Sequence, residues 1–309
     1  ELAGELCDLF EDITRPYKGT YPRLRDSVKV VLAASGPELV PQFEKPLRAA
    51  ALKSLKEKGV EVYLNTRVNE ITPTMARLSV KGFHDKGYAM QPTEVKLPIG
   101  LSVWCAGTTP VSFVENLLQK LPPEARNQDG RVKVDRWMRP PMYDPSLLGS
   151  VLVLGDAAAQ PSGDYEGAGF LPATAQVAGQ QGAFLARTLS RNYNLTTTPP
   201  KIADFEVTRY PEFSVFYDPA MTNWLKFRGL EQSPPFTFLN LGMLAYVGGG
   251  EALSQIQLGD TKVTSQSGST GFLLWRSVYL VKQVATRNRA LVTFDWLKTS
   301  IFGRDITRL

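Results

Sequence analysis

The chain has 309 residues, of which 43% are hydrophobic and 21% charged, and its formal net charge is +5. This composition is typical of a globular protein with about two domains, and it excludes intrinsic disorder, collagen and a coiled coil. No apolar run reaches the roughly 18 residues of a spanning helix, which excludes a polytopic membrane protein. The two cysteines, Cys7 and Cys105, and the single histidine, His84, argue against a disulfide framework and against a structural metal site.

The first part of the chain predicts a parallel α/β unit. Residues 1–10 already run at helical periodicity, with no preceding cap residue and no initiating Met, so we expect further residues upstream. The apolar residues 27–32 predict a buried strand, and residues 41–58 predict a helix that Gly59 terminates. Residues 60–64 alternate as a second strand, and this order of strand, helix and strand is typical of a parallel sheet.

Short strands with frequent turns then predict an antiparallel meander. Its strands are expected at residues 68–71, 76–80 and 93–97. His84 falls between them in a polar turn, where we expect it to be exposed. Residues 101–108 predict an apolar strand that ends in the small residues Ala106 and Gly107, where a backbone can approach a ligand closely.

A second pair of strands, followed by a helix, predicts a ligand-binding edge. Residues 131–134 and 151–158 are expected to form the strands, and the second one stops at Gly155 and Asp156. In open α/β sheets ligands lie beyond the carboxyl ends of strands, where an Asp can accept hydrogen bonds from sugar hydroxyls. Residues 172–191 predict a helix whose many small residues permit close packing against another backbone or a flat ring.

The remaining third of the chain gives a more mixed pattern. Residues 196–200 are typical of a linker, and residues 201–235 have no pattern that assigns an element. Residues 242–250 predict a strand with a glycine turn, and residues 259–271 predict a polar, turn-rich segment. Two amphipathic helices are predicted to close the chain.

The two closing helices carry the charge excess of the whole chain. The last forty residues contain seven basic and two acidic side chains, which accounts for the formal charge of +5. Apolar faces are formed by Leu274, Val278, Val281 and Ala285 in the first helix and by Phe294, Leu297 and Ile301 in the second. Aromatic and basic side chains interleaved in this way favour helices that lie in a membrane interface, while docking on the core is the alternative.

The sequence offers ligand-facing features but no acid–base machinery. It contains no nucleophile elbow, no paired catalytic carboxylates, no phosphate loop and no Gly-x-Gly-x-x-Gly motif. What remains are the strand ends at Gly107 and Asp156, together with Gln176, Gln180 and Gln181 on the small-residue helix. This combination is typical of an enzyme whose cofactor performs the chemistry while the protein binds and orients it.

Three motifs, in this order, carry a resemblance to a known family. They are Leu-Pro-Ala-Thr-Ala-Gln-Val-Ala-Gly-Gln-Gln at residues 171–181, Leu-Ala-Tyr-Val-Gly at residues 244–248 and Phe-Gly-Arg-Asp at residues 302–305. The chain resembles type II (alternative, rotenone-insensitive) NADH dehydrogenases over nearly its whole length. The resemblance implies a monotopic flavoprotein that passes a hydride from NADH or NADPH to FAD and then two electrons to a membrane quinone, without pumping protons.

The fold that the resemblance implies is α/β, with two Rossmann-like dinucleotide-binding domains and a C-terminal membrane-docking domain of amphipathic helices. Residues 1–108 would belong to the NAD(P)H-binding domain, truncated at its N-terminus, and residues 109–199 to the returning segment of the FAD-binding domain. Residues 200–309 would form the membrane-anchoring and quinone-site domain, with residues 270–309 on anionic lipid. Peripheral attachment to an organelle inner membrane, mitochondrial or plastid, and a homodimer are also implied.

The resemblance also implies roles for individual residues. The positions that match FAD-binding residues are Gly155, Asp156, Ala175 and Gln176, with Asp156 on the ribityl chain. The positions on the quinone side are Gln176 and Gln180, with Tyr279 at the quinone tunnel. The positions that match NAD(P)H-binding residues are Glu1, Ala33, Cys105, Ala106 and Gly107. No metal ligand is implied.

Three departures from the family pattern bear on function. Both glycine fingerprints would lie upstream of Glu1, so we expect the 309-residue piece alone to bind neither dinucleotide tightly and to be inactive. Ala33 lies near the position of the acidic residue that holds the adenosine ribose, so discrimination against NADPH should weaken. The sequence has no Asp-x-Asp-x-Asp-Gly loop, and we expect no regulation by calcium through an EF-hand.

Other interpretations remain open at this point. A sulfide:quinone oxidoreductase would need redox cysteines near the flavin, and Cys7 and Cys105 are poorly placed for that chemistry. A non-catalytic membrane-docking module would need only the closing helices. Nucleic-acid binding is less favoured, because the basic residues lie on amphipathic helices without a recognition fold.

Overall fold

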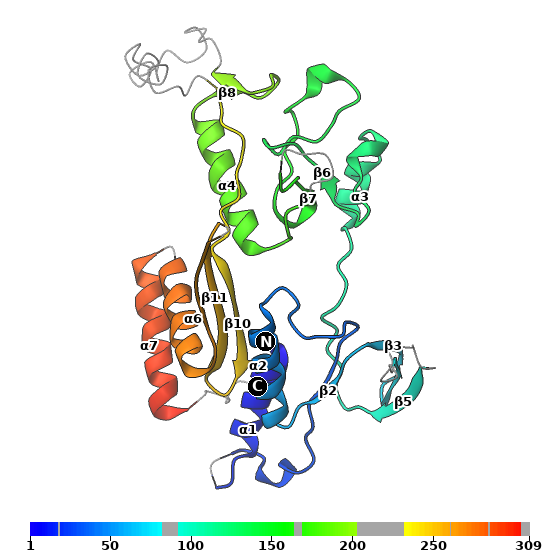
Figure 1. The fold of residues 1–309 in the computed structure, drawn as a ribbon, viewed down its shortest axis with the longest axis vertical. Helices are drawn as coiled ribbons and strands as arrows, with labels where there is room; N and C mark the ends of the chain where they lie inside the picture. The colour runs from blue at the N-terminus through cyan, green and yellow to red at the C-terminus, as the bar shows by residue number, and fades with distance from the viewer. Residues whose placement is uncertain are drawn as a thin grey trace. The chain divides into compact units, whose positions relative to one another are not determined.

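Contacts within the chain define two compact units (Figure 1). The computed structural model describes residues 1–17, 19–81, 92–163, 169–202, 232–259, 261–283 and 285–303. Unit 1 comprises Glu1–Trp104 and Leu239–Leu309, and unit 2 comprises Cys105–Phe238. Unit 1 therefore joins two stretches that are far apart in the sequence. This division rests on contacts alone, and the three functional domains stay a prediction.

Unit 1 is a mixed α/β structure. Its elements are α1 Leu2–Thr14, a 3-10 turn Pro22–Leu24, β1 Val31–Ala33, α2 Lys45–Glu57, β2 Glu61–Tyr63, β3 Thr66–Ile71, β4 Met75–Val80, β5 Thr93–Pro98, β10 Gly242–Gly248, β11 Glu251–Leu258, β12 Thr261–Gln266, α6 Gly268–Lys282 and α7 Thr286–Phe302. The helix predicted at residues 1–10 is present from Leu2, and it continues to Thr14.

The first two sheets of unit 1 follow the sequence pattern. β1 and β2 pair in parallel, with Val31 opposite Glu61 and Ala33 opposite Tyr63, which confirms the predicted strand–helix–strand unit. Both strands are shorter than predicted, since each has a single ladder neighbour in the described part of the chain. β3, β4 and β5 form the predicted antiparallel meander. His84 lies outside the described residues.

α2 starts later than predicted and ends where predicted. It begins at Lys45 instead of residue 41, because Pro46 fits the first turn, where a missing N–H costs no helical hydrogen bond. At its other end, Gly59 has φ of +79° and the Val60 N–H donates to the Leu55 carbonyl oxygen at 3.0 Å. This geometry confirms that the glycine terminates the helix.

The sheet β10–β11–β12 is the centre of unit 1, with helices on both faces. The core on one face is formed by Phe43, Leu47, Ala51, Ala245, Val247 and Leu253. Tyr246, the residue between two of these core positions, points to the other face and lies 5.4 Å from Phe272 of α6, measured between ring centroids. Alternate residues of β10 thus face α2 and α6. Figure 1 shows α7 lying beside α6.

α1 covers the edge of β10 by an approach of backbone to backbone. A Cβ atom on Gly4 would lie 2.5 Å from the carbonyl carbon of Val247, and a Cβ atom on Gly248 would lie 2.8 Å from the carbonyl oxygen of Gly4. Only glycine fits at both positions. The Glu1 carboxylate accepts a hydrogen bond from the Tyr246 N–H at 3.1 Å. This bond gives a partner to a backbone N–H on the edge of the sheet.

α2 is tied to the turn that follows β10. Ser54 Oγ donates to Glu251 Oε2 at 2.6 Å, and Lys58 Nζ donates to the same oxygen at 3.0 Å. These hydrogen bonds, with the Ser54 bond as the largest cause, lower the pKa of Glu251. The glycine turn predicted after this strand is present, and it is held by α2 through Glu251.

The C-terminal part of unit 1 differs from the prediction in two places. The turn-rich segment predicted for residues 259–271 contains the strand β12, which pairs antiparallel with β11. β12 is an outer strand of its sheet, and polar residues on an outer strand give no apolar alternation that could be recognised. α6 ends at Lys282 and Ala285 is the N-cap of α7, so the predicted place of Ala285 on the face of the first helix is wrong.

The described residues of unit 2 form one long helix, short helices and short strands. Its elements are α3 Ser112–Leu118, 3-10 turns at Pro123–Ala125, Pro145–Leu147 and Gly155–Ala157, β6 Val132–Lys133, β7 Ala158–Ala159, α4 Ala175–Ser190, β8 Tyr193–Asn194 and β9 Lys201–Ile202. α4 lies inside the helix predicted at residues 172–191, which is confirmed. Two separate cores form, one around Val132 and Ala158 and the other around Met138 and Phe184.

Two strands predicted for this region need correction. Residues 101–108 form no strand, and Leu101 and Trp104 are exposed, because no ladder partner lies beside them among the described residues. Within residues 151–158, only Ala158 belongs to a strand, β7, which pairs in parallel with β6. Asp156 therefore lies in a 3-10 turn before a strand and not at a strand's carboxyl end.

A buried arginine holds residues 196–200, the segment predicted to be a linker. Arg139 is almost fully buried, and its Nη1 donates to the carbonyl oxygens of Leu195 and Thr197, each at 2.6 Å. Its Nε donates to Asp135 Oδ2 at 2.7 Å. The predicted linker is in fact the turn of the β8–β9 hairpin, fixed to the core of unit 2.

The close approach of α1 to β10 predicts that Gly4→Ala destabilises unit 1. The added methyl group would overlap backbone atoms of β10, and such overpacking costs about 1–3 kcal/mol. Gly179→Ala is the matched control, because Gly179 is also helical and a Cβ atom there would meet nothing within 4 Å. The control should be stabilised by about 0.5–1 kcal/mol. Chemical denaturation measures both, and equal effects of the two substitutions would contradict the packing described.

Candidate functional site

A buried amide chain fixes the first group of predicted site residues, in unit 2. The N–H of Gly155 donates to Gln181 Oε1 at 2.7 Å, and Gln181 Nε2 donates to Gln160 Oε1 at 2.7 Å. Both glutamines are almost fully buried. Gln181 is therefore a structural residue that holds the Gly155 turn against α4, and its predicted ligand-facing position is wrong.

Around this chain, a carboxylate and a helix N-terminus are presented to solvent. Asp156 is exposed in the turn that contacts α4, and Ala175, the first residue of α4, is exposed as well. Gln176 and Gln180 follow on the helix and are partly exposed. A helix N-terminus carries partial positive charge, so this edge combines an acceptor for hydroxyl groups with a site that favours negative charge.

Gly155 has the conformation that a close backbone approach requires. Its φ is +66°, which non-glycine residues rarely adopt, and a Cβ atom there would lie only 3.3 Å from the Cβ of Ala178. A side chain at this position would therefore both strain the backbone and fill the space beside α4. The absence of a side chain at Gly155 therefore lets the turn lie close against α4.

The second group of predicted site residues lies in unit 1, around Tyr246. The Tyr246 hydroxyl donates to Asp8 Oδ2 at 2.5 Å, and the Gly249 N–H donates to Asp8 Oδ1 at 2.7 Å. Burial, followed by the hydrogen bond to Asp8, raises the pKa of Tyr246 to about 12. Because Glu1 binds the Tyr246 backbone, the predicted NAD(P)H residue Glu1 is engaged with β10.

Aromatic rings connect Tyr246 to Tyr279. The ring centroids of Tyr246 and Trp275 lie 5.7 Å apart, and those of Trp275 and Tyr279 lie 4.4 Å apart. Burial raises the pKa of Tyr279, and the negative charge of Glu1 raises it further. Tyr279, predicted at the quinone tunnel, therefore keeps its hydroxyl proton and lies within electrostatic reach of Glu1.

α7 is held to α6 by a stacked arginine and leaves its apolar residues exposed. The guanidinium carbon of Arg276 lies 4.5 Å from the ring centroid of Phe272 and 5.0 Å from that of Trp296. None of the described residues of α7 is buried. Its large exposed apolar side chains are Leu291, Phe294, Leu297, Ile301 and Phe302.

The remaining predicted NAD(P)H residues are dispersed. Ala33 is the last residue of β1 in unit 1. Cys105, Ala106 and Gly107 begin unit 2 and are exposed, with φ of +75° at Gly107 and open space around it. Each unit thus brings some predicted residues together: Gly155, Asp156, Ala175, Gln176 and Gln180 in unit 2, and Glu1 and Tyr279 in unit 1. Their roles stay predictions.

Sequence reasoning missed two residues that organise the group in unit 1, namely Asp8 and Tyr246. A signal was present, because Glu1, Gly4 and Asp8 recur at helical spacing and so share one face of α1. What the sequence could not supply was the partner of this face, since β10 lies more than 230 residues away along the chain.

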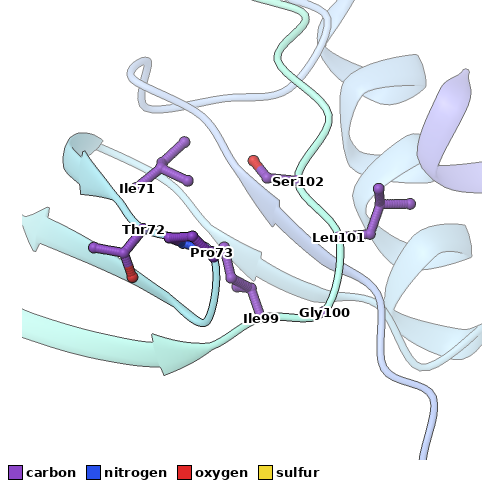
Figure 2. A pocket seen from close by; sticks show the side chains of 7 residues that line it. All are labelled: Ile71, Thr72, Pro73, Ile99, Gly100, Leu101 and Ser102. Atoms are coloured by element: carbon purple, nitrogen blue, oxygen red, sulfur yellow. The ribbon is translucent and has the colours of Figure 1, made fainter.

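Unit 1 also contains a hollow (Figure 2). It has a volume of about 420 Å³ and is lined by Ile71, Thr72, Pro73, Ile99, Gly100, Leu101 and Ser102. The lining is mostly apolar, and no predicted site residue contributes to it. Across the described ranges, no group of three or more His, Cys, Asp or Glu side chains could hold a metal ion. None of the helices in these ranges is long and apolar enough to cross a membrane.

Comparison with known proteins places this α/β chain among the dinucleotide-dependent oxidoreductases. Residues 1–182 match the family described as pyridine nucleotide-disulphide oxidoreductase, and residues 240–305 match the NDH2 C-terminal domain. The first match covers more than half of the chain, and the chain belongs to this family. The resemblance and the α/β, Rossmann-like fold class predicted from the sequence are confirmed.

Individual relatives agree with this assignment. A probable mitochondrial NADH-ubiquinone oxidoreductase of Schizosaccharomyces pombe is 30% identical over 100% of this chain and 52% of its own length. An internal alternative NAD(P)H-ubiquinone oxidoreductase of Arabidopsis thaliana, also mitochondrial, is 31% identical over 100% of this chain and 50% of its own length. The chain thus spans about half the length of the curated relatives it matches.

Solved structures confirm the fold. The structure of NDH2 from Plasmodium falciparum in complex with NADH matches with a TM-score of 0.72 and 15% identity, over 98% of this chain and 64% of that chain. The sulfide:quinone oxidoreductase of Aquifex aeolicus matches with a TM-score of 0.52 and 13% identity, over 97% of this chain and 58% of that chain. At these identities the likeness concerns the fold alone.

The raised pKa of Tyr246 predicts how stability depends on alkaline pH. In the unfolded chain the hydroxyl loses its proton near its ordinary pKa of 10.0, whereas in the folded chain it does so at about 12. The unfolded state thus binds fewer protons in this range, and stability falls as the pH rises from about 10 to 12. Tyr246→Phe should be less stable at neutral pH by about 1 kcal/mol, because it loses the bond to Asp8, and should show a shallower alkaline loss. The measurement is the free energy of unfolding of both proteins, obtained by denaturation at several pH values in this range. If that free energy fell equally steeply with pH in both proteins, the raised pKa would not belong to Tyr246.

Proposed function

We propose that this protein is a type II NADH:quinone oxidoreductase. It passes a hydride from NADH or NADPH to FAD and two electrons to a membrane quinone, without pumping protons. The observation that carries the proposal is the order of two matches in one chain: the oxidoreductase family at residues 1–182 and the NDH2 C-terminal domain at residues 240–305. The alignment with NADH-ubiquinone oxidoreductases over the whole chain supports it.

In this proposal FAD is held at the edge formed by the Gly155 turn and the start of α4. The positive φ at Gly155, together with the absence of a side chain there, is compatible with the close approach of a flat or extended ligand. Asp156 accepts hydrogen bonds from ribityl hydroxyls, and the α4 N-terminus at Ala175 and Gln176 stabilises negative charge. FAD, when bound, supplies hydride acceptance and electron transfer, and the described residues bind and orient it.

The NAD(P)H side is proposed to involve Ala33 at the end of β1 and the exposed segment Cys105, Ala106 and Gly107. The conformation of Gly107 and the open space around it are compatible with a nearby dinucleotide backbone. Glu1 contributes by fixing the first turn of α1 to β10, because its carboxylate is bound to the Tyr246 N–H. This contact supports a positioning role for Glu1.

On the acceptor side, Tyr279, Gln176 and Gln180 are proposed to orient the quinone. A tyrosine keeps its hydroxyl proton at neutral pH, and burial and the charge of Glu1 raise the pKa of Tyr279 further from that range. Its hydroxyl can therefore donate to a quinone carbonyl. The side-chain amides of Gln176 and Gln180 provide further donors on the exposed part of α4. These groups bind and hold the acceptor, and they need no catalytic nucleophile.

Attachment to a membrane surface is the third part of the proposal. The exposed apolar side chains of α7 and the basic residues of the last forty positions would contact an anionic leaflet, as interfacial helices do. Relatives named as mitochondrial enzymes support a mitochondrial location. A monotopic position on the inner membrane of that organelle, with a plastid membrane as the alternative, is part of the proposal. A homodimer belongs to the same proposal.

A sulfide:quinone oxidoreductase is less well supported. Such chemistry needs reactive cysteines, whereas burial, followed by the charge of Asp8, raises the pKa of the Cys7 thiol and disfavours its thiolate. Cys105 is free and exposed but belongs to the other unit. A docking module without a catalytic function would fail the experiment that follows, because it would hold no reducible flavin.

Separate half-reactions of the holoenzyme test the proposal. Tyr279→Phe and Gln176→Leu should slow flavin reoxidation by a short-chain quinone by about tenfold, since each loses a donor to the acceptor. Flavin reduction by NADH should stay within about twofold. The control is Tyr143→Phe, on an exposed tyrosine outside both groups. Stopped-flow absorbance follows both steps, and an equal loss in both steps would refute the acceptor-side placement.

Membrane attachment is tested on the exposed apolar residues of α7. The double substitution Phe294→Ser and Leu297→Ser should lower binding of the holoenzyme to anionic liposomes by tenfold or more, because each buried apolar side chain contributes about 1.5–3 kcal/mol. NADH oxidation with a soluble dye should persist. Leu258→Ser is the matched control, since Leu258 is 59% exposed, against 66% for Phe294 and 56% for Leu297. Unchanged flotation with liposomes would contradict the proposed surface.

A further inference from the structure

One arginine of unit 1, Arg276 of α6, lies between two aromatic rings. Its guanidinium carbon is 4.5 Å from the ring centroid of Phe272, one turn earlier on α6, and 5.0 Å from that of Trp296 on α7. Both distances are within the range of a cation–π interaction. The two rings therefore hold the planar group between the two helices, which Figure 1 shows side by side.

No group of the described chain neutralises this side chain. No described residue forms a hydrogen bond or an ion pair with Arg276, and its Nε atom is enclosed without a partner. The terminal nitrogens Nη1 and Nη2 are not enclosed in this way. α6 and α7 contain one acidic residue, Asp295, whose carboxylate lies 3.9 Å from Lys298 Nζ. A partly buried guanidinium without a counter-ion is unusual, because charges away from water are normally paired.

Arg139 of unit 2 shows how the same chain treats a stacked arginine in its own core. The Arg139 guanidinium carbon also lies over an indole ring, 5.2 Å from the centroid of Trp137. Its Nε donates to Asp135 Oδ2 at 2.7 Å, and its Nη1 donates to backbone carbonyl oxygens. Arg139 thus has both a carboxylate and neutral acceptors. The lack of both at Arg276 indicates that its anion comes from outside the described chain.

The surroundings of Arg276 indicate the chemistry of that anion. A guanidinium presents parallel N–H groups that match two oxygens of a phosphate. Leu273, three residues before Arg276 on the same helix, is 66% exposed, and Leu297, which follows Trp296 on α7, is 56% exposed. A free phosphate has no apolar part for these side chains, whereas a phospholipid carries acyl chains next to its phosphate.

We propose that Arg276 binds the phosphate group of one anionic phospholipid. Phe272 and Trp296 hold the guanidinium, and Leu273 and Leu297 contact the acyl chains. The inference rests on the proposed membrane attachment and deepens it. Attraction by net charge treats lysine and arginine alike, whereas a phosphate site needs the planar, stacked guanidinium. One basic residue thus selects the lipid, while the other basic residues attract the anionic surface.

A substitution that keeps the charge tests the inference in the holoenzyme. Arg276→Lys should weaken binding to phosphatidylcholine vesicles that contain phosphatidylglycerol by about tenfold, as expected for the loss of one charge-assisted contact. Arg287→Lys is the matched control, because it makes the same change at an exposed arginine of α7, and it should stay within about twofold of the wild type. Equal effects of the two substitutions would overturn the inference.

Titration with a short-chain lipid gives a second measurement that needs no membrane. Dihexanoylphosphatidylglycerol, below its micelle concentration, should bind the wild-type holoenzyme and raise its unfolding temperature. Inorganic phosphate should bind at least about tenfold more weakly, because it lacks the acyl chains. No binding of the short-chain lipid would overturn the inference, and so would equal affinity for inorganic phosphate.

A second variant covers the case in which Arg276→Lys does not fold, which its unfolding temperature without lipid would show. Arg276→Gln keeps a planar donor and loses the charge, so it should bind the short-chain lipid about tenfold more weakly than the wild type. Unchanged affinity would overturn the inference.

The two measurements also separate the phosphate site from the proposed membrane attachment. Vesicle binding that needs the apolar residues of α7 but is unchanged in Arg276→Lys would contradict the phosphate site alone. A wild-type holoenzyme that binds no vesicles, yet binds the short-chain lipid through Arg276, would contradict the membrane attachment alone.

Discussion

The contact between the backbones of Gly4 and Gly248 is the constraint on which unit 1 depends. Without side chains at these positions, α1 can lie against β10 closely enough for Glu1 and Asp8 to reach it. The stretch that begins the chain is thereby joined to a sheet formed near its other end. Tyr246 takes its orientation from this contact, and through Trp275 so does Tyr279.

Three buried polar side chains of unit 2, Arg139, Gln160 and Gln181, are paired by hydrogen bonds, and this pairing positions the exposed groups beside them. Arg139 donates hydrogen bonds to Asp135 and to carbonyl oxygens of the segment before β9. Gln181 donates to Gln160 through its side-chain amide and accepts a hydrogen bond from the Gly155 N–H. A buried polar group that lost its partner would cost about 1–3 kcal/mol, so these arrangements are rigid. The exposed Asp156 turn is consequently held in one place beside the start of α4, as a cofactor site requires.

The sequence predicted what depends on neighbouring residues along the chain. The periodicity of α2, its glycine terminus, the parallel pairing of β1 with β2 and the small-residue helix α4 all follow from local pattern. Residues 101–108 have an apolar pattern but no strand beside them, and β12 is polar, so pattern alone misassigned both. The bond from Tyr246 to Asp8 spans 238 residues, and no local signal could pair them. The motif at residues 244–248 indicated that β10 matters for the family resemblance, but it did not indicate that α1 packs against this strand.

The measurement that tests the account most directly is an anaerobic titration of the holoenzyme, followed by its visible absorbance spectrum. The account predicts a flavin band that NADH bleaches with a stoichiometry of one and that a short-chain quinone then restores. A purified holoenzyme without a flavin band, or with a flavin that NADH reduces but no quinone reoxidises, would contradict it.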